Sequence, residues 1–311
     1  MELRHLRYFV AVADSGGVSR AASRLNISQP ALSRQIRDFE AELGVSLFDR
    51  RMGRLLLTGE GEDLLALGRE LLRGAESMRE RAHVLRGGDA GIIRVGAAPL
   101  TLESLLPGFL SQHCQRYPTI DVHLTEDGPG RLWERLEQGD LDLAISFPGH
   151  EGLGSKLLFP VCAVVLMSPD HRFSRRKTVE VSELSSERLL LPNRQFLTRQ
   201  WFDTACQRDR FRPIVVLESG APHALIALAK VGYGIAIVPS HIPFDRKHTR
   251  AVRLTQRGKL LGAWAAIAWN PHRFRSAFVE RFVDELARYS RYSYPGRDVA
   301  GRDAFKLARE A

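Results

Sequence analysis

The stretch AASRLNISQPALSRQIRDFEAELG, residues 21–44, constrains the fold more than any other part of this chain. Its second half has apolar residues spaced four, three and four apart, which place one stripe along an α-helix: Leu32, Ile36, Phe39 and Leu43. If that stripe packs against a core, the opposite side of the helix is exposed. That side carries small, polar and cationic residues, which suit an anionic partner.

Two shorter helical patterns precede this helix, over residues 3–13 and 18–25. A tight turn at residues 26–28 separates the second pattern from the third. We expect Ser28 to cap the third helix through its hydroxyl and Pro30 to lie in the first turn, where a missing N–H is tolerated. Gly44 is expected to end the helix. The segment therefore predicts three short helices.

Two helices joined by a three-residue turn form a helix-turn-helix, whose second helix enters the major groove of DNA with its N-terminal residues nearest the bases. Glutamine can pair with adenine, arginine with guanine, and proline or alanine can contact a thymine methyl group. The candidate DNA-reading residues share the exposed side of the third helix. They are Gln29, Pro30, Ala31, Ser33, Arg34 and Arg37.

Residues 45–58 predict a small β-hairpin wing with a basic turn between two apolar ends. Its arginines could reach phosphates or the minor groove. They are Arg50, Arg51 and Arg54. Residues 1–58 hold nine arginines against six acidic residues, an excess of only +3, so the placement of these residues indicates DNA more than their number does. A plain three-helix bundle remains the alternative.

The whole chain of 311 residues has a net charge of +9, which favours nucleic acid, acidic ligands or anionic membranes as partners, or serves solubility alone. No apolar run reaches the roughly 18 residues of a membrane span. The first residues lack a signal-peptide pattern, so we expect a cytoplasmic protein with no membrane partner. Cys114, Cys162 and Cys206 form no CxxC pair and are expected to be packing residues, although a redox role for Cys206 stays open.

Residues 59–86 predict one long linker helix with a heptad pattern of alternating large and small residues. The pattern comprises Leu64, Gly68, Leu71, Ala75, Met78, Ala82 and Leu85. A helix of that length, about 42 Å, needs more partner surface than a small head offers. A second copy would supply it, so we expect a homodimer or homotetramer binding two-fold related half-sites of double-stranded DNA. Packing against its own chain is the alternative. GGDAG, residues 87–91, predicts a hinge.

From residue 92 onward, strand and helix patterns alternate, which predicts α/β units with mostly parallel sheets. The expected strands are 92–98, 120–126, 141–147, 161–168, 188–192, 213–218, 235–240 and 262–269. The expected helices are 101–118, 131–140, 198–208, 222–231 and 274–289. Two crossovers, near residues 148–160 and near Trp269, join two such units and leave a cleft between them. A polar tail, residues 291–311, is expected to be disordered.

Clefts between α/β units bind small ligands, and helix N-termini point at the ligand. The candidate ligand-binding residues lie at helix starts and strand ends. They are Leu100, Thr101, Leu102, Phe147, Phe196, Leu197, Thr198, Ser219 and Gly220. Exposed N–H groups and hydroxyls there favour a small organic anion, with Arg194 or Arg199 in reserve. Helix capping is the alternative for the threonines, and core packing for the phenylalanines.

The run FVAVADSGGVSRAASRLNISQPALSRQIRDFEAELGVSLFDRRMGRLLLTGEGEDLL resembles the N-terminal domain of LysR-type transcriptional regulators, above all in AASRLNISQPALSRQI and LGVSLFDR. Weaker similarity in RVG, LLPGFLSQHCQRYP, LEQGDLDLAI and VGYGIAIVP extends to their effector domain, itself similar to periplasmic binding proteins. The resemblance implies a DNA-binding regulator with paired linker helices and an effector between two subdomains. Gly17 departs from it, because we expect a serine there.

The expected architecture is multidomain: an all-α winged helix-turn-helix head, a long linker helix, and an α/β effector domain of two subdomains. The expected ranges are 1–58 for the head, 59–86 for the linker, 87–91 for the hinge and 92–290 for the effector domain. Within it, subdomain I spans about 92–160 and 269–290, and subdomain II about 161–268.

The alternative functions place an enzyme or a solute-binding protein on the α/β part. No HExxH, Walker or GxSxG motif occurs in the sequence. His241 and His248 lack metal-ligand spacing for one helix face. We therefore expect no catalytic residue, no metal and no cofactor.

Overall fold

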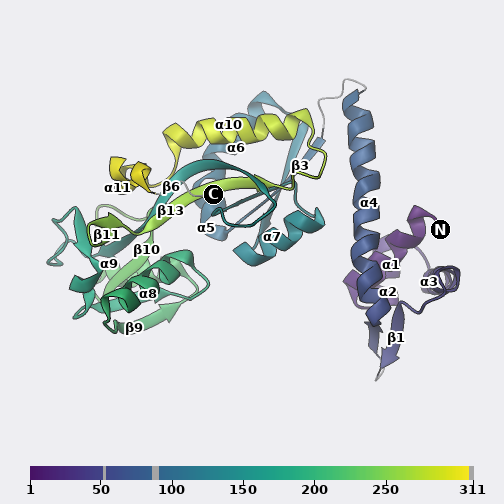
Figure 1. The fold of residues 1–311 in the computed structure, drawn as a ribbon, viewed down its shortest axis with the longest axis horizontal. Helices are drawn as coiled ribbons and strands as arrows, with labels where there is room; N and C mark the ends of the chain where they lie inside the picture. The colour runs from purple at the N-terminus through teal and green to yellow at the C-terminus, as the bar shows by residue number, and fades with distance from the viewer. Residues whose placement is uncertain (52–53, 86–90, 308–311) are drawn as a thin grey trace. The chain divides into compact units, whose positions relative to one another are not determined.

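The computed structural model describes residues 1–51, 54–85 and 91–307. The chain forms two compact units, residues 1–90 with the short segment 137–140, and residues 91–136 with 141–311 (Figure 1). The predicted hinge, residues 87–91, lies outside the described residues except for Gly91, which begins the first strand of the second unit. Each unit is described by itself below.

The first unit contains three short helices, a two-stranded hairpin and one long helix, as the sequence predicts. They are α1 (Leu3–Ser15), α2 (Val18–Leu25), α3 (Gln29–Leu43), β1 (Phe48–Arg51), β2 (Arg54–Leu57) and α4 (Gly59–Leu85). The Ser28 side chain accepts a hydrogen bond from the Ala31 N–H at 3.4 Å, and Gly44 ends α3 in the left-handed conformation with φ 74°. The predicted cap and stop signals of α3 are therefore confirmed.

The apolar stripe of α3 forms one wall of the first unit's core. Leu32, Ile36 and Phe39 are buried, and the Phe39 ring lies 6.2 Å from the ring of Phe9 on α1. The Glu40 carboxylate accepts hydrogen bonds from two N–H groups at the start of the hairpin, those of Leu47 (2.7 Å) and Phe48 (3.1 Å). The packing of this stripe and the Glu40 carboxylate, which lies one turn after Ile36, together fix the orientation of α3.

Helix α4 packs against the head with the side that carries Leu64, Leu65, Gly68 and Leu72. A Cβ at Gly68 would lie 3.5 Å from Leu6 and 3.8 Å from Phe9, so α4 approaches α1 closely there. In the predicted pairing seam, Gly68 is buried against the chain's own head, so the prediction is wrong for Gly68, whereas Leu64 is half-buried there. The physical reason is that α1 competes for the same heptad positions.

A different side of α4 stays open and carries three large apolar residues among those whose side chains the structure describes. Leu67, Leu71 and Met78 have exposed fractions of 55%, 49% and 66%, and Gly74 lies between them. Their spacing of four, three and four follows one face of the helix. This face, Leu67–Met78, is open to a second copy.

The second unit contains two α/β subdomains, each built around strands of one mixed sheet. Its first part comprises β3 (Gly91–Ala97), α5 (Pro99–Ser104), α6 (Leu106–Arg116), β4 (Ile120–Glu126), α7 (Pro129–Gln138), β5 (Leu143–Ser146) and β6 (Gly154–Met167). Its middle part comprises β7 (Thr178–Glu180), η1 (Val181–Leu184), β8 (Arg188–Pro192), α8 (Leu197–Asp209), β9 (Ile214–Ser219), α9 (Pro222–Lys230) and β10 (Ile235–Pro239). Its last part comprises β11 (Arg250–Gln256), β12 (Lys259–Leu260), β13 (Gly262–Trp269), α10 (Ala277–Ser293), α11 (Arg297–Ala300) and η2 (Arg302–Lys306).

The strand order is β4-β3-β5-β13-β6-β10-β8-β9, and β11 also pairs with β6. In subdomain I, β3 pairs parallel with β4 and β5; in subdomain II, β8 pairs parallel with β9 and β10. The two predicted crossovers are two long antiparallel strands, β6 and β13, which lie side by side in Figure 1. One end of β6 pairs with β13 and the other with β10 and β11, so this strand belongs to both subdomains.

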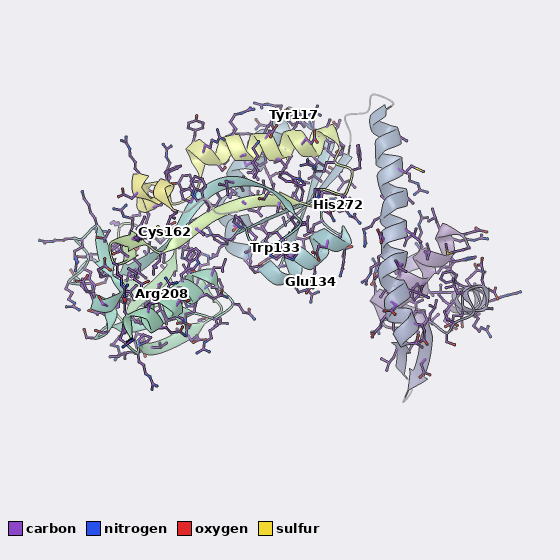
Figure 2. All side chains as sticks on the ribbon, in the orientation of Figure 1. Tyr117, Trp133, Glu134, Cys162, Arg208 and His272 are labelled. Carbon is purple, nitrogen blue, oxygen red and sulfur yellow. The ribbon has the colours of Figure 1, made fainter. Side chains whose placement is uncertain are left out.

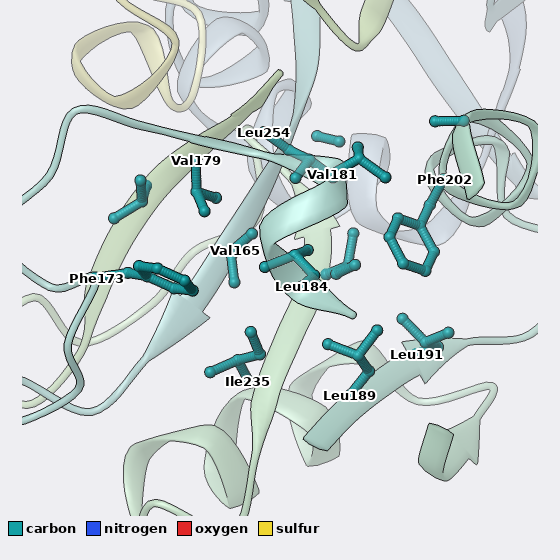
Figure 3. Close-up of a cluster of buried hydrophobic side chains, with 14 of the residues drawn as sticks. Val165, Phe173, Val179, Val181, Leu184, Leu189, Leu191, Phe202, Ile235 and Leu254 are labelled. Atoms are coloured by element: carbon teal, nitrogen blue, oxygen red, sulfur yellow. The ribbon is translucent and has the colours of Figure 1, made fainter. Parts of the chain in front are cut away.

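Subdomain II has a dense apolar core around the inner half of β6. Figure 3 shows Val165 of β6, Leu189 and Leu191 of β8 and Ile235 of β10 gathered near Phe202 of α8. All five are at most 1% exposed. These β-branched and leucine-rich strands are buried on both faces, which is typical of parallel sheets covered by helices.

Several predictions about the second unit are wrong: the strand expected from residue 161 begins at Gly154, and β7, β11 and β12 were not expected. The single helix expected over residues 101–118 is two helices, α5 and α6, separated at Leu105. Pro107 is the second residue of α6. Proline lacks an N–H and clashes with a continuous preceding helix, so a break falls in front of it.

The tail expected to be disordered is ordered through Leu307 and packs on β6 and β13. Tyr294 is 4% exposed and its ring stacks on Phe159 at 5.4 Å, while Phe305 meets Trp264 edge-on at 5.6 Å. Its aromatic rings bury enough apolar surface to offset the entropy of ordering, which a count of arginines did not show. Residues 308–311 lie outside the described residues.

The cysteines are free, and two of them are buried. Cys162 lies on β6 (Figure 2), and burial raises the pKa of its thiol to about 11. Burial likewise raises the pKa of Cys206 to about 12. Both thiols are protonated at neutral pH, which disfavours the redox role left open for Cys206. Within the described ranges, no helix combines the length and apolarity of a membrane span.

Candidate nucleic-acid interface and ligand cavity

The face of α3 opposite its buried stripe is open. Gln29, Pro30, Ala31 and Arg37 are exposed, Ser33 is half-buried, and the Arg34 side chain is 78% exposed. The Arg34 guanidinium lies 3.8 Å from the Asp38 carboxylate one turn on, and Arg37 donates to the Ser33 carbonyl at 3.4 Å. These contacts are local and exposed, so most guanidinium N–H groups remain directed at solvent. The six predicted α3 residues therefore form one continuous surface.

The hairpin β1–β2 carries the predicted wing arginines. Arg50 pairs with Leu55 and Arg51 with Arg54 in an antiparallel register. The side chains of Arg50, Arg51 and Arg54 lie outside the described residues, as do Met52 and Gly53. The backbone alone places them at and beside the turn of the hairpin.

Helix α2 exposes polar residues that were not among the predicted DNA-binding residues. Ala21 and Ala22 face the core, whereas Ser23 and Arg24 are exposed. In a helix-turn-helix the first helix crosses the DNA backbone. The four-residue spacing of exposed Arg20 and Arg24 on so short a helix was the available signal.

The second unit has a cavity of about 710 Å³ between its two subdomains, a volume typical of small-molecule sites. Subdomain I contributes the ends of β3, β4 and β5, and subdomain II the starts of α8 and α9. Its lining includes Pro99, Ile145, Ser146, Asn193, Gln195, Trp201, Ala221 and Pro222. Val161 of β6 and Pro239 of β10 complete the wall where the subdomains join.

Seven of the nine predicted ligand-binding residues line this cavity: Leu100, Thr101, Phe147, Phe196, Leu197, Thr198 and Gly220. Leu102 and Ser219 do not. The Ser219 hydroxyl instead accepts a hydrogen bond from the Ala221 N–H at 3.1 Å and shapes the turn into α9. Nothing in the structure assigns Leu102, which is half-buried on α5, a role in binding.

The arginines held in reserve do not reach the cavity. Arg199 is 5% exposed, and its guanidinium is bonded to Asp203 (2.8 Å), Glu218 (2.9 Å) and the Pro192 carbonyl (3.0 Å). Arg194 lines a separate groove. The residues found to line the cavity include no lysine or arginine.

Three carboxylates line the cavity and differ in their partners. Glu103 of α5 pairs with His223 of α9 at 3.0 Å, so this pair joins the two subdomains beside the cavity. The Asp127 carboxylate is neutralised by Arg135 at 3.2 Å and Arg131 at 3.8 Å. Glu126 is exposed and forms no ion pair with any described residue. The negative charge at Glu126 is therefore uncompensated.

His241 is the one lining residue with a strongly perturbed acidity in the described part of the chain. It is 6% exposed, and burial lowers the pKa of its imidazole to about 4. The ring is neutral at pH 7 and meets Phe159 edge-on at 6.1 Å. Its Nδ1 atom has no hydrogen-bond partner in the described structure. A buried unpaired nitrogen is costly, so a bound polar group would stabilise it.

The N-terminus of α8 supplies hydrogen-bond donors to the cavity. Its first helical hydrogen bonds are donated by Arg199 and Gln200 to the Phe196 carbonyl. The N–H groups of Leu197 and Thr198 precede these bonds and have no carbonyl within the helix, and the helix dipole makes this end positive. Trp201, edge-on to Phe147 at 5.5 Å, adds an apolar wall. The cavity suits a largely apolar molecule with one acceptor group.

The comparisons with known proteins match both units of the chain. Residues 3–62 match the model of bacterial regulatory helix-turn-helix proteins of the lysR family, and residues 86–291 match the LysR substrate binding domain. The chain belongs to the LysR family. This LysR-family protein is a DNA-binding transcriptional regulator with an effector-binding domain.

The matches between this LysR-family regulator and its relatives cover most of both chains. The transcriptional regulator AlsR of Bacillus subtilis is 30% identical over 244 residues, which cover 77% of this chain and 81% of AlsR. A full-length OxyR variant of Pseudomonas aeruginosa is 26% identical, with a TM-score of 0.71, and the match covers 94% of this chain and 95% of that one.

The solved complex of the LysR-family regulator CbnR with its target DNA shares the fold, with a TM-score of 0.65 at 24% identity. The match covers 93% of this chain and 100% of CbnR. The winged head and the two-subdomain α/β unit of this regulator thus follow the family's architecture.

Proposed function

We propose that this regulator acts in the cytoplasm, reads operator DNA with the open face of α3, and responds to a small effector without converting it. The observation that carries the proposal is the division of α3 into a buried apolar stripe and an open polar face. Because the N-terminal turn of such a helix lies nearest the bases, Gln29 and Arg34 read base edges. Arg37 and the wing arginines bind phosphates.

Two heads are needed for a two-fold operator, and the open face of α4 supports their pairing. Leu67, Leu71 and Met78 would be buried between two copies, with Gly74 allowing close approach of the helices. Burial of apolar side chains of this size stabilises an interface by roughly 25 cal/mol per Å². The regulator therefore acts as a homo-oligomer built from α4 pairs.

The proposed effector is a small organic acid with an apolar body and one carboxylate. The N–H groups of Leu197 and Thr198, together with the Thr198 hydroxyl, bind that carboxylate, and the two arginines held in reserve take no part. A second negative group would meet the uncompensated charge of Glu126. The cavity thus favours monocarboxylates over dicarboxylates, and the neutral His241 supplies one further hydrogen bond.

The DNA proposal is tested by selecting genomic fragments that the purified protein retains and measuring affinity for the best fragment by fluorescence anisotropy. Arg34→Ala is expected to weaken specific binding by about 1–3 kcal/mol, because a base contact is lost. Arg4→Ala is the matched control: it removes the same charge from a 59% exposed side chain of the same unit. Equal affinities of Arg34→Ala and the unaltered protein would contradict the proposed reading of bases by Arg34.

The effector proposal is tested by calorimetric titration with aromatic and aliphatic monocarboxylates and their dicarboxylate counterparts, beside product analysis of each mixture. Monocarboxylates are expected to bind more tightly and to be recovered unchanged. Thr198→Val should weaken binding by roughly tenfold, and Glu126→Gln should reduce the preference for monocarboxylates. Tighter binding of dicarboxylates, or formation of product, would overturn this assignment.

A further inference from the structure

A second groove, of about 540 Å³, lies between β11 and the C-terminal residues. It shares no lining residue with the effector cavity. Six of its lining residues are cationic: Arg176, Lys177, Arg246, Arg250, Arg253 and Arg302. Only two are acidic, Asp298 and Asp303. The effector cavity, by contrast, is lined by carboxylates and by no lysine or arginine.

The C-terminal wall of this groove is a packed structure that lies beyond the matched substrate binding domain, which ends at residue 291. Ala300 and Ala304 are fully buried, and the Trp264 indole N–H donates to the Leu307 carbonyl at 3.2 Å. Gly301 adopts φ +69°, and a Cβ there would lie 2.9 Å from an Arg253 nitrogen. The chain end is thus held against β11 closely enough to form a defined concave surface.

Both acidic residues of the groove are already paired. Asp298 forms an ion pair with Arg246, and Asp303 lies 3.2 Å from Arg253. Arg253 also donates to the Ala300 carbonyl at 3.3 Å, so this arginine ties the chain end to β11. Glu183, which lies outside the groove, forms a bidentate ion pair with Arg176, whose two terminal guanidinium nitrogens lie 2.6 and 3.0 Å from the carboxylate oxygens. Three of the six cations are therefore compensated by carboxylates.

The other three cations have no carboxylate partner in the described part of the chain: Lys177, Arg250 and Arg302. Arg250 donates only to the backbone carbonyls of Arg246 (2.7 Å) and Thr249 (3.1 Å). Three like charges gathered around one concave surface repel each other, and an anion between them relieves that repulsion. The groove is therefore built for a ligand of high negative charge.

We propose that this groove binds a small molecule carrying two or more linked phosphates. Arginine presents its N–H groups in a fork that matches phosphate oxygens, and lysine adds a mobile point charge. Di- and triphosphates carry about as many negative charges at neutral pH as the groove has unpaired cations. A volume of about 540 Å³ accommodates a nucleotide as well as inorganic pyrophosphate. The half-buried ring of Phe244 lines the same groove and offers an apolar surface to a base.

The test is calorimetric titration of the full-length protein with inorganic pyrophosphate and, separately, with ATP. Both are expected to bind. Tighter binding of ATP than of pyrophosphate would indicate that the nucleoside also contacts the groove. The triple variant Lys177→Gln, Arg250→Gln, Arg302→Gln should weaken both by at least about tenfold, because charge-assisted hydrogen bonds are lost. The matched control is Arg208→Gln, Arg212→Gln, Lys259→Gln, which removes the same residue types from exposed positions outside the groove.

Three results would overturn the proposal. They are no binding of either probe up to roughly millimolar concentration, an equal loss in the control variant, or displacement of pyrophosphate by a short non-operator duplex. Thermal unfolding of both triple variants verifies that they fold. Because no groove residue lies in the first unit or lines the effector cavity, operator and effector binding by the triple variant are expected to match those of the control. A failure here is thereby separated from a failure of the proposed regulator function.

Discussion

The α3 face and the effector cavity are assembled in opposite ways. The six residues of the α3 face fall within nine consecutive positions of one helix, so the helical period alone brings them together. The lining of the cavity extends from Ala98 to His241 and comes from both subdomains. The first site depends on local structure and the second on the packing of a whole domain.

The two sites also differ in charge, although they belong to one chain of net charge +9. The α3 face has two exposed arginines, whereas the cavity combines carboxylates, a neutral histidine and a helix N-terminus. Arg199 lies near the cavity but does not line it, because two carboxylates and a backbone carbonyl bind its guanidinium. The net charge of the whole chain therefore does not predict the charge of either site.

The largest expected effect is the loss of one binding activity, with the other retained, when the core of one unit is mutated. Phe39→Ala, which empties a site 1% exposed in the core of the head, should destabilise that unit by about 3–5 kcal/mol and abolish operator binding. Effector binding should persist, because the cavity takes no residue from the head. Phe202→Ala, at a fully buried site of subdomain II, is the reciprocal control. Loss of both activities in Phe39→Ala, seen by anisotropy and calorimetry, would contradict the separation.

The next effect is a pH dependence confined to the second unit. The pKa of His241 is about 4 in the folded protein and ordinarily 6.5, so between these values the unfolded chain binds a proton that the folded chain does not. The free energy of unfolding therefore includes the whole contribution of the neutral ring above pH 6.5. This contribution, about 3 kcal/mol in total, is lost as the pH falls toward 4.

His241→Asn should reduce this loss when urea unfolding is compared at pH 7.5 and pH 5. The same substitution at the exposed His272 serves as the control. An unchanged pH dependence in His241→Asn would show that other groups account for it.

A smaller effect is expected at the start of α3. Ser28→Ala removes the side-chain acceptor of the Ala31 N–H and should destabilise the head by about 1 kcal/mol, with Ser28→Asp restoring the cap. Thermal unfolding of the head measures the shift. A variant as stable as the unaltered protein would mean that water replaces the Ser28 hydroxyl at this cap.

Sequence patterns predicted the head almost completely, because its signals are local. Ser28 and Gly44 mark the ends of α3, and the stripe from Leu32 to Leu43 gives its orientation. The pairing seam of α4 was predicted less well, since Leu64 and Gly68 contact the head through tertiary packing that no heptad pattern contains.

The lining residues of the cavity that were predicted from sequence lie at a predicted helix start or strand end. Thr198 and Phe147 were found in this way. Glu126 ends β4 and His241 lies two residues after β10, so a strand end was present at both, but a strand end alone does not indicate that these residues meet at the cavity. The ordered chain end was missed for the same reason: Tyr294 is buried because Phe159, 135 residues earlier, provides a surface for it.

The most direct test of the α3 assignment is photo-crosslinking from a single exposed cysteine in a protein whose exposed Cys114 is replaced by serine, while Cys162 and Cys206 stay buried. A photoactivatable group on Ala31→Cys, in the first turn of α3, should crosslink efficiently to a selected operator duplex. The same group on Ala41→Cys, exposed ten residues further along the same helix, should crosslink far less. Equal crosslinking from both positions, or crosslinking from Ala41→Cys alone, would contradict the placement of the N-terminal half of α3 against DNA.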